Sequence, residues 1–174
     1  AVGFLGGNAG KTIESVLNEW GINNDFIWVR GETRTNTKVY EKSGALTELN
    51  EPGPQISKEQ QEELVKKLEG YANEETLFVL AGSIPNGVDK QIYSEIIPRV
   101  HAKGAKVLLD ADGELFRNAL KEKPDIIKPN RVELEEYFGF DYRVSMEELL
   151  EAARKLQAQG IETVAVSMGK SGAM

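Results

Sequence analysis

The sequence predicts an α/β fold, in which helices cover both faces of a mostly parallel β-sheet in three layers. Short apolar runs without polar alternation recur along the chain, at residues 77–81, 107–109, 125–127 and 163–166. Strands of this kind are buried on both faces, which is typical of parallel sheets. Segments with helical periodicity separate the runs, and this alternation indicates a doubly wound sheet. Ligands bind such sheets at the carboxyl ends of the strands.

Composition narrows the function classes. The chain has 174 residues, 40% of them hydrophobic, a formal net charge of −7 and no cysteine. Its length and apolar content suit one domain with a core and argue against a disordered chain. The acidic balance argues against nucleic-acid or membrane partners, and the absence of cysteine excludes disulfides and thiolate zinc sites. No apolar run approaches the roughly 18 residues of a membrane span, and no leader-like segment opens the chain, so we expect a cytoplasmic protein.

The predicted helices begin and end at recognisable residues. Capping boxes over 57–60 and 145–148 open two helices, which Gly70 and Gly160 should end. Another helix is expected over residues 92–100, although Pro98 should interrupt or kink it. These strands and helices account for most of the chain outside residues 27–50.

Residues 27–50 contain strand-like runs with no helix between them. The first run is residues 27–30, and Ser43-Gly44 supplies a tight turn between the last two. We therefore expect residues 27–50 to form a small antiparallel β lid on an α/β core made of residues 1–26 and 51–174. The chain starts at Ala1 within a strand-like run and stops inside a turn, so we interpret it as an internal fragment.

The segment Gly6–Thr12 is similar to the phosphate loop of P-loop nucleotidases. Its glycines lie at the wrong spacing, however, because counting back from Gly10 places Leu5 where the first glycine belongs. That loop needs a fixed number of backbone amides around the phosphates. An ordinary glycine-rich turn between strand and helix is the better interpretation, and a P-loop enzyme remains an alternative.

Basic residues in the lid form another candidate site. Arg34 and Lys38 lie four residues apart in a segment expected to be extended, where they would share one face and could hold a phosphate. From spacing alone, a solvated polar face is the simpler explanation. Ser83 follows the strand at 77–81, where a hydroxyl and backbone amides could meet an anion.

Residues after the later strands could hold a nucleotide. Asn130 and Glu133 suit the cap of the next helix, and a carboxylate there beside Lys128 could also organise Mg²⁺ and phosphates. Glycines at 169 and 172 would let the backbone approach a nucleotide near Ser167.

Three further polar residues are weaker candidates. Asp110 and Asp112 could both face a metal at a strand end, but Asp112 is more simply a helix N-cap. The single histidine, His101, is expected to be a surface residue at a helix end.

The order of these motifs resembles that of the ribokinase-like carbohydrate kinases of the PfkB group, over essentially the whole chain. Within the group, the branch that acts on fructose 1-phosphate is most similar, and tagatose-6-phosphate kinases are near relatives. The resemblance is carried by Gly31-Glu32-Thr33-Arg34, Thr47-Glu48-Leu49-Asn50-Glu51-Pro52-Gly53-Pro54, Ala81-Gly82-Ser83-Ile84-Pro85, Lys128-Pro129-Asn130-Arg131-Val132-Glu133 and Ser167-Met168-Gly169.

The resemblance implies transfer of the γ-phosphoryl group of ATP to fructose 1-phosphate, giving fructose 1,6-bisphosphate, with a β lid that closes over the sugar phosphate and can also serve in a homodimer. It implies Mg²⁺ as a second cofactor, with Glu133 organising it. The sugar phosphate would contact Arg34, Lys38 and Ser83, and the nucleotide would contact Lys128, Asn130, Glu133, Ser167, Gly169 and Gly172.

The sequence carries no match to the family's catalytic-base loop, Gly-Ala-Gly-Asp, or to its leading sugar-binding strand. No catalytic residue is therefore assigned, and the chain alone is expected to be close to inactive, because phosphoryl transfer depends on positioning and charge stabilisation. A non-catalytic sugar-phosphate or nucleotide-binding module on the same fold remains the other alternative.

Overall fold

The computed structural model describes residues 1–174, which divide into two compact units. The first unit comprises residues 1–67 and 84–88, and the second comprises residues 68–83 and 89–174. Helix α2 (Lys58–Tyr71) includes residues of both.

The first unit contains a short parallel strand pair beside a helix. Strand β1 (Phe4–Leu5) pairs in parallel with β2 (Ile27–Trp28), and helix α1 (Gly7–Glu19) connects them. The expectation that residues 27–30 belong to the antiparallel lid is therefore wrong. Ile27 is buried, and its amide donates a hydrogen bond to the Gly3 carbonyl at 2.9 Å, so this run belongs with β1.

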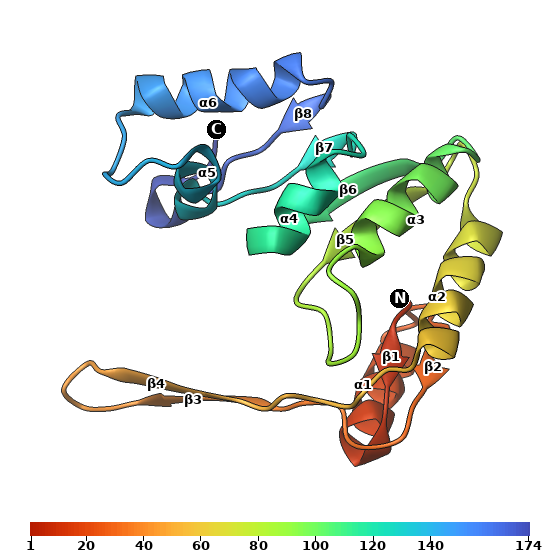
Figure 1. Cartoon of the computed structure of the whole chain (residues 1–174). Coiled ribbons are helices and arrows are strands. Elements are labelled where there is room, and N and C mark those ends of the chain that lie inside the picture. The colour runs from red at the N-terminus through yellow and green to blue at the C-terminus, as the bar shows by residue number, and fades with distance from the viewer. The chain divides into compact units, whose positions relative to one another are not determined.

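The antiparallel part of the first unit is a two-stranded ribbon, seen as a long hairpin in Figure 1. Strand β3 (Asn36–Tyr40) pairs with β4 (Leu46–Asn50), with Lys38 opposite Glu48. Every residue of both strands is exposed. The expected hairpin turn is present, since Gly44 has a φ of +86°.

The second unit is built on the predicted parallel sheet. Its strands are β5 (Leu77–Ala81), β6 (Lys106–Asp110), β7 (Ile126–Ile127) and β8 (Thr163–Val164), hydrogen-bonded in that order and all parallel. Because the strands are parallel, their carboxyl ends meet at one edge of the sheet.

Four helices accompany this sheet: α3 (Ile92–His101), α4 (Gly113–Leu120), α5 (Arg131–Phe138) and α6 (Met146–Ala158). Helices α3 and α4 lie side by side against β6, and α6 contacts α5 and β8 (Figure 1). The expected interruption at Pro98 is absent, since α3 continues to His101, and the buried side chains of Ile97 and Val100 on either side hold the helix in place.

The other helix boundaries agree with the sequence. Ser57 and Gln60 exchange the two hydrogen bonds of a capping box at the start of α2, at 2.9 and 3.3 Å. Ser145 and Glu148 do the same for α6. Helix α2 ends at Tyr71, one residue beyond the expected stop.

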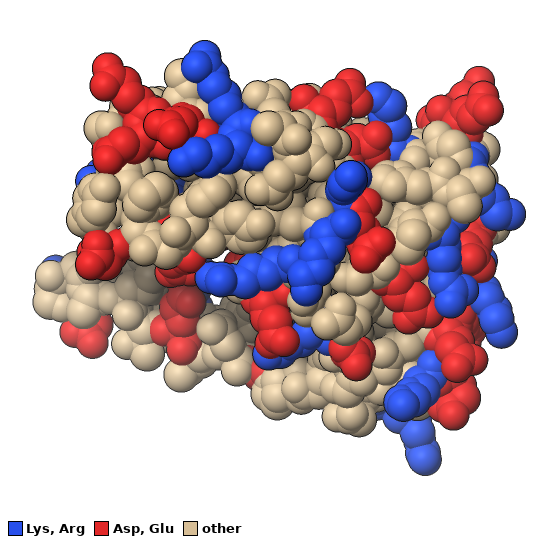
Figure 2. Space-filling model, turned by 45° about the horizontal axis from the view of Figure 1, so that its top comes forward, with Lys and Arg blue, Asp and Glu red and all other residues tan.

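Charged side chains of both signs are interspersed on the face of the molecule shown in Figure 2. No helix has both the length and the apolar character needed to cross a bilayer.

Candidate functional site

Two charged residues meet at the carboxyl edge of the sheet. Asp110 is the last residue of β6 and Lys128 follows β7, and Lys128 Nζ lies 3.0 Å from Asp110 Oδ2. The backbone fixes both positions, since the Lys128 amide donates to the Leu109 carbonyl at 3.0 Å and the Gly82 amide donates to the Asp110 carbonyl at 3.3 Å. Both side chains are partly exposed, so the ammonium group remains accessible to a ligand.

Asn130 and Glu133 form a capping box at the start of α5. The Glu133 amide donates to Asn130 Oδ1 at 3.0 Å, and the Asn130 amide donates to Glu133 Oε2 at 2.8 Å. The side-chain amide of Asn130 also donates to Glu133 Oε1. These bonds hold the Glu133 carboxylate, which is partly buried, at the positive end of the helix.

Ser167 lies next to Asn130. The two residues form a parallel β-bridge, and the Arg131 amide donates to the Ser167 carbonyl at 3.0 Å. The chain then turns at Gly169 and Gly172, with φ of +59° and +84°, conformations that favour glycine. A Cβ at either glycine would meet no atom within 4 Å, so the turn leaves open space at this edge.

Tyr93 supports the first strand of this edge. Its hydroxyl donates to the carbonyl of Ala81, the last residue of β5, at 3.2 Å. Burial raises the pKa of the Tyr93 hydroxyl, and the nearby charge of Asp110 raises this pKa further. Ser83 follows two residues after β5, within the same unit as Lys128 and Asn130.

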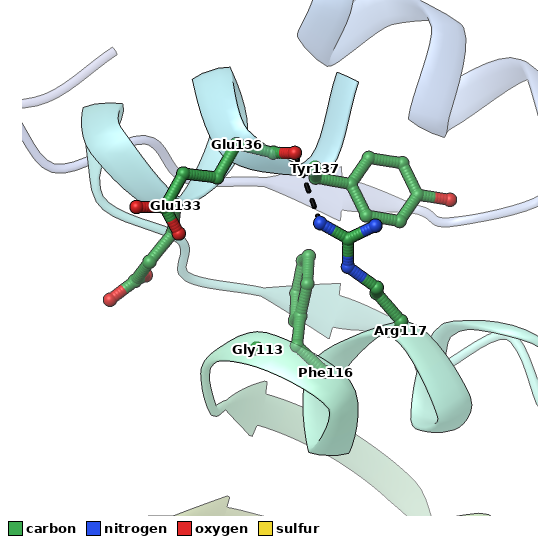
Figure 3. Close-up of a pocket in the computed structure, with 6 residues that line it drawn as sticks. All are labelled: Gly113, Phe116, Arg117, Glu133, Glu136 and Tyr137. Carbon is green, nitrogen blue, oxygen red and sulfur yellow. Dashed lines mark hydrogen bonds between the residues drawn. The ribbon is translucent and has the colours of Figure 1, made fainter. Parts of the chain in front are cut away.

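A shallow pocket between α4 and α5 adjoins Glu133 (Figure 3). Arg117 of α4 donates to the Glu136 carbonyl at 3.1 Å, and its guanidinium lies 5.9 Å from the centre of the Tyr137 ring. Phe116 meets the same ring edge-on, with centroids 5.7 Å apart. These contacts fix α5, and with it Glu133, against α4.

The two basic residues predicted for the sugar phosphate lie in the first unit. Strand β3 begins at Asn36, so the regular alternation of a strand includes Lys38 but not Arg34. Lys38 Nζ lies 2.7 Å from Glu48 Oε1 across the ribbon, and the hydrogen bond that the ammonium group donates to that carboxylate raises the pKa of Lys38. Arg34 precedes the ribbon, and its side chain lies alongside Gly53.

The glycine-rich start of α1 binds a carboxylate of the same chain, that of Glu32. The amides of Asn8 and Ala9 donate to Glu32 Oε1 and Oε2 at 3.1 and 3.2 Å. These are the amides that a phosphate loop would offer to a nucleotide. The structure thus favours a structural turn over the phosphate-loop alternative.

The weaker candidates have ordinary structural surroundings. Asp112 is the N-cap residue of α4, as expected, although its side chain makes no capping hydrogen bond. His101, expected at the surface, is partly buried at the end of α3, with Nε2 3.0 Å from Asp125 Oδ2. That carboxylate also accepts a bond of 2.7 Å from the Val107 amide, so the pair joins α3 to the sheet.

The donor set at the sheet edge fits a magnesium–nucleotide complex. Mg²⁺ in such sites takes one or two carboxylates and completes its shell with phosphate oxygens and water. A carboxylate has about four lone-pair positions, and the two capping bonds leave Glu133 with acceptor capacity for a cation or its water. Lys128 and Asn130 carry donors suited to phosphates, and the turn at Gly169 and Gly172 leaves space beside them.

Sequence reasoning did not identify the Lys128–Asp110 ion pair, the Tyr93 hydrogen bond or the role of Glu32. Glu32 stands within the quoted motif Gly31-Glu32-Thr33-Arg34, and its position two residues after a strand-like run was the only available signal. The partners of all three lie far away in sequence.

The capping box of Asn130 and Glu133 lies at the carboxyl edge of the parallel sheet, where sheets of this kind bind ligands. The whole chain, residues 1–174, matches the pfkB family of carbohydrate kinases, and the chain belongs to this family.

Individual relatives agree with this assignment. The chain is 36% identical to the 1-phosphofructokinase of Haemophilus influenzae over 172 residues, which are 99% of the chain and 55% of the relative. It is 38% identical to the 1-phosphofructokinase of Bacillus subtilis over 174 residues, 100% of the chain and 56% of the relative. The chain thus spans about half the length of the curated relatives it matches.

Solved structures share the fold. Phosphofructokinase-2 from Escherichia coli, in complex with substrates and products, has a TM-score of 0.89 and 24% sequence identity. The alignment covers 99% of this chain and 57% of that one. At this identity the likeness establishes the ribokinase-like fold.

Proposed function

We propose that the protein carrying this chain is an ATP-dependent sugar-phosphate kinase that converts fructose 1-phosphate to fructose 1,6-bisphosphate. Similarity to 1-phosphofructokinases at 36% and 38% identity supports this substrate. The observation that carries the proposal is the placement of Asn130, Glu133 and Lys128 beside Ser167, at the edge where parallel sheets bind ligands. ATP and sugar phosphates are cytoplasmic metabolites, so we place this activity in the cytoplasm.

In this proposal, Lys128, Asn130, Ser167, Gly169 and Gly172 contact the nucleotide. Glu133 holds Mg²⁺, which when bound neutralises charge on the phosphates. The capping bonds from Asn130 fix the carboxylate before the nucleotide arrives, so binding loses little side-chain entropy. Before the nucleotide binds, the ion pair with Asp110 keeps the Lys128 ammonium group at the sheet edge.

In the same proposal, the residues that contact the sugar phosphate are Arg34, Lys38 and Ser83. Lys38 would exchange its ion pair with Glu48 for the phosphate, an exchange between two anions at an exposed site. We propose that the ribbon β3–β4 is the lid.

A coupled assay with Mg-ATP tests the proposal in the protein that carries this chain. Fructose 1-phosphate and tagatose 6-phosphate are compared as acceptors, and we expect fructose 1-phosphate to have the higher kcat/KM. Glu133→Gln should lower kcat by about a hundredfold, since one positioned charge in phosphoryl transfer has an effect of this order. Ser145→Ala, which alters a capping box in α6, is the matched control with unchanged kcat. If neither sugar phosphate is turned over, the proposal is contradicted.

We also propose a homodimer through the ribbon. Val39 and Leu49, 45% and 58% exposed, lie on one face of it, while Tyr40 and Leu46 lie on the other. A two-stranded ribbon without a packed face is marginal in water, so a second copy would stabilise it. The Escherichia coli relative has been described in a tetrameric inhibited form. Sedimentation should show a dimer that Leu49→Asp converts to a monomer, and an unchanged sedimentation coefficient contradicts this interface.

A further inference from the structure

The N-terminus of α1 is occupied by a carboxylate of the chain itself. Both oxygens of Glu32 accept hydrogen bonds from the first turn, from the amides of Asn8 and Ala9. The first amides of a helix lack intrahelical acceptors and carry the positive end of the helix dipole, so they favour a negative charge. Glu32 is 24 residues away from Asn8 in sequence, and its carboxylate therefore joins two separate segments.

The backbone of α1 is shaped around this carboxylate. Gly7 has a φ of +62°, a conformation that side-chain-bearing residues rarely adopt. A Cβ at Gly7 would also overlap the Glu32 carboxylate. Glycine is thus required at this position both for its conformation and for the space that Glu32 occupies.

Thr33 extends the contact by one residue. The Gly6 amide donates to Thr33 Oγ1 at 2.9 Å, and the Thr33 amide donates to the Gly6 carbonyl at 3.0 Å. A Cβ at Gly6 would overlap the Gly31 carbonyl, so the two backbones run in close contact. We call Glu32 and Thr33 the anchor of the ribbon.

Arg34 follows the anchor directly, and the returning segment holds it from the other side. The Thr35 amide donates to Glu51 Oε2 at 2.8 Å. Gly53, with a φ of +73°, lies against the Arg34 side chain, and a Cβ there would be 3.4 Å from the Arg34 Cβ. The backbone on both sides of Arg34 is thus attached to fixed groups, whereas the ribbon beyond it is exposed.

We propose that Glu32 is a positioning residue for the sugar phosphate. Its carboxylate fixes the root of the ribbon to α1 and thereby sets the direction in which Arg34 leaves the anchor. This inference rests on the proposed function, in which Arg34 binds the phosphate group. The helix N-terminus thus holds an internal carboxylate that orients a cation for an external anion.

Hydrogen–deuterium exchange of the protein that carries this chain tests the anchor. We expect Glu32→Ala and Glu32→Gln to increase uptake in residues 33–53 and in the first turn of α1. Ser145→Ala, the matched loss of a cap in α6, should leave both segments unchanged. Formate, a small carboxylate, should restore protection in Glu32→Ala. Unchanged uptake in residues 33–53 overturns the proposal.

The second measurement addresses positioning, in the protein that carries this chain. Glu32→Ala should weaken fructose 1-phosphate binding by about tenfold, the effect of losing one charge-assisted anchor, while ATP affinity is unchanged. Formate should recover part of the loss. Gly7→Ala, which displaces the carboxylate, should reproduce the effect with Glu32 still present. Equal losses for sugar phosphate and ATP, or no loss for either, overturn the proposal.

The two proposals fail in different ways. If the unmodified protein binds no fructose 1-phosphate, the proposed function is wrong and Glu32 has no phosphate to position, whatever the exchange result. If the protein binds it and Arg34→Ala abolishes binding while Glu32→Ala does not weaken it, the function stands and the positioning role is overturned.

Discussion

The ribbon β3–β4 and the sheet β5–β8 are stabilised in opposite ways. No residue of the ribbon is buried, whereas β6 has Val107 and Leu109 with 0% exposure. The ribbon is held by its cross-strand hydrogen bonds, by the Lys38–Glu48 ion pair and by its root. Exposed ion pairs contribute little to stability, so the ribbon's order depends on the ends to which it is attached.

This difference matches the roles we propose for the two regions. A sheet edge that holds a nucleotide needs fixed backbone positions, and burial of apolar side chains provides them. A lid must open and close, and segments with few buried contacts are the ones that open at low free-energy cost. The anchor of Glu32 and Thr33 then limits the movement to the residues beyond Arg34.

The largest expected effect is on the free energy of unfolding, which should depend on the buried side chains of the sheet and not on the exposed ones of the ribbon. Leu109→Ala should lower the free energy of unfolding by about 3 kcal/mol, because it removes a fully buried side chain from β6. Leu49→Ala in the ribbon, where the side chain is 58% exposed in the single chain, should change it by less than about 0.5 kcal/mol at a protein concentration at which the protein is monomeric. Urea denaturation followed by circular dichroism measures both. Similar losses for the two variants would show that the ribbon has a core of its own.

The effect of intermediate size tests whether the capping box at the sheet edge also serves in ATP binding. Asn130→Ala and Ser145→Ala each remove the N-cap of one helix and should each lower the free energy of unfolding by about 1 kcal/mol. Only Asn130→Ala should also weaken ATP binding, measured by calorimetry, because it releases the Glu133 carboxylate. Equal ATP affinity in the two variants would mean that the Asn130 cap is purely structural.

The smallest effect concerns pH. The pKa of Tyr93 is raised in the folded protein, chiefly by burial, above the ordinary tyrosine value of about 10. The unfolded state loses the hydroxyl proton first, so the stability that Tyr93 contributes is present below about pH 10 and is lost as pH rises through the raised pKa. Thermal melts of the chain between pH 8 and pH 11, at about half-unit steps, should fall less steeply for Tyr93→Phe. Parallel curves would contradict burial of this hydroxyl.

The parallel sheet and most helix ends could be predicted from sequence because local patterns encode them. Apolar runs mark strands such as β6, and capping boxes such as Ser145 with Glu148 mark helix starts. The pattern of β2 was misassigned because Ile27 and Trp28 have the composition of any strand, and their parallel partner is chosen by burial of Ile27. Pro98 stays within α3 because tertiary packing outweighs one lost hydrogen bond.

The candidate site was predictable where a motif is local and hidden where it depends on distant partners. Asn130 and Glu133 lie within one helical turn, so their capping box follows from sequence. The ion pair of Lys128 with Asp110 needs the register of β6 beside β7. The hydrogen bonds that Glu32 accepts from α1 depend on a contact between two chain segments that the sequence pattern does not specify.

The central claim is that the basic residue at the root of the lid, and not the glycine-rich turn at α1, binds a phosphate group. Titration of fructose 1-phosphate into the protein that carries this chain tests it, with Arg34→Ala and Lys11→Ala measured side by side. We predict that Arg34→Ala weakens binding by at least about thirtyfold, since charged hydrogen bonds to phosphate have effects of this size. Lys11→Ala should leave the affinity within about twofold, because Lys11 is an exposed residue of α1 outside the proposed site. The reverse pattern, with binding lost in Lys11→Ala and retained in Arg34→Ala, would contradict the account.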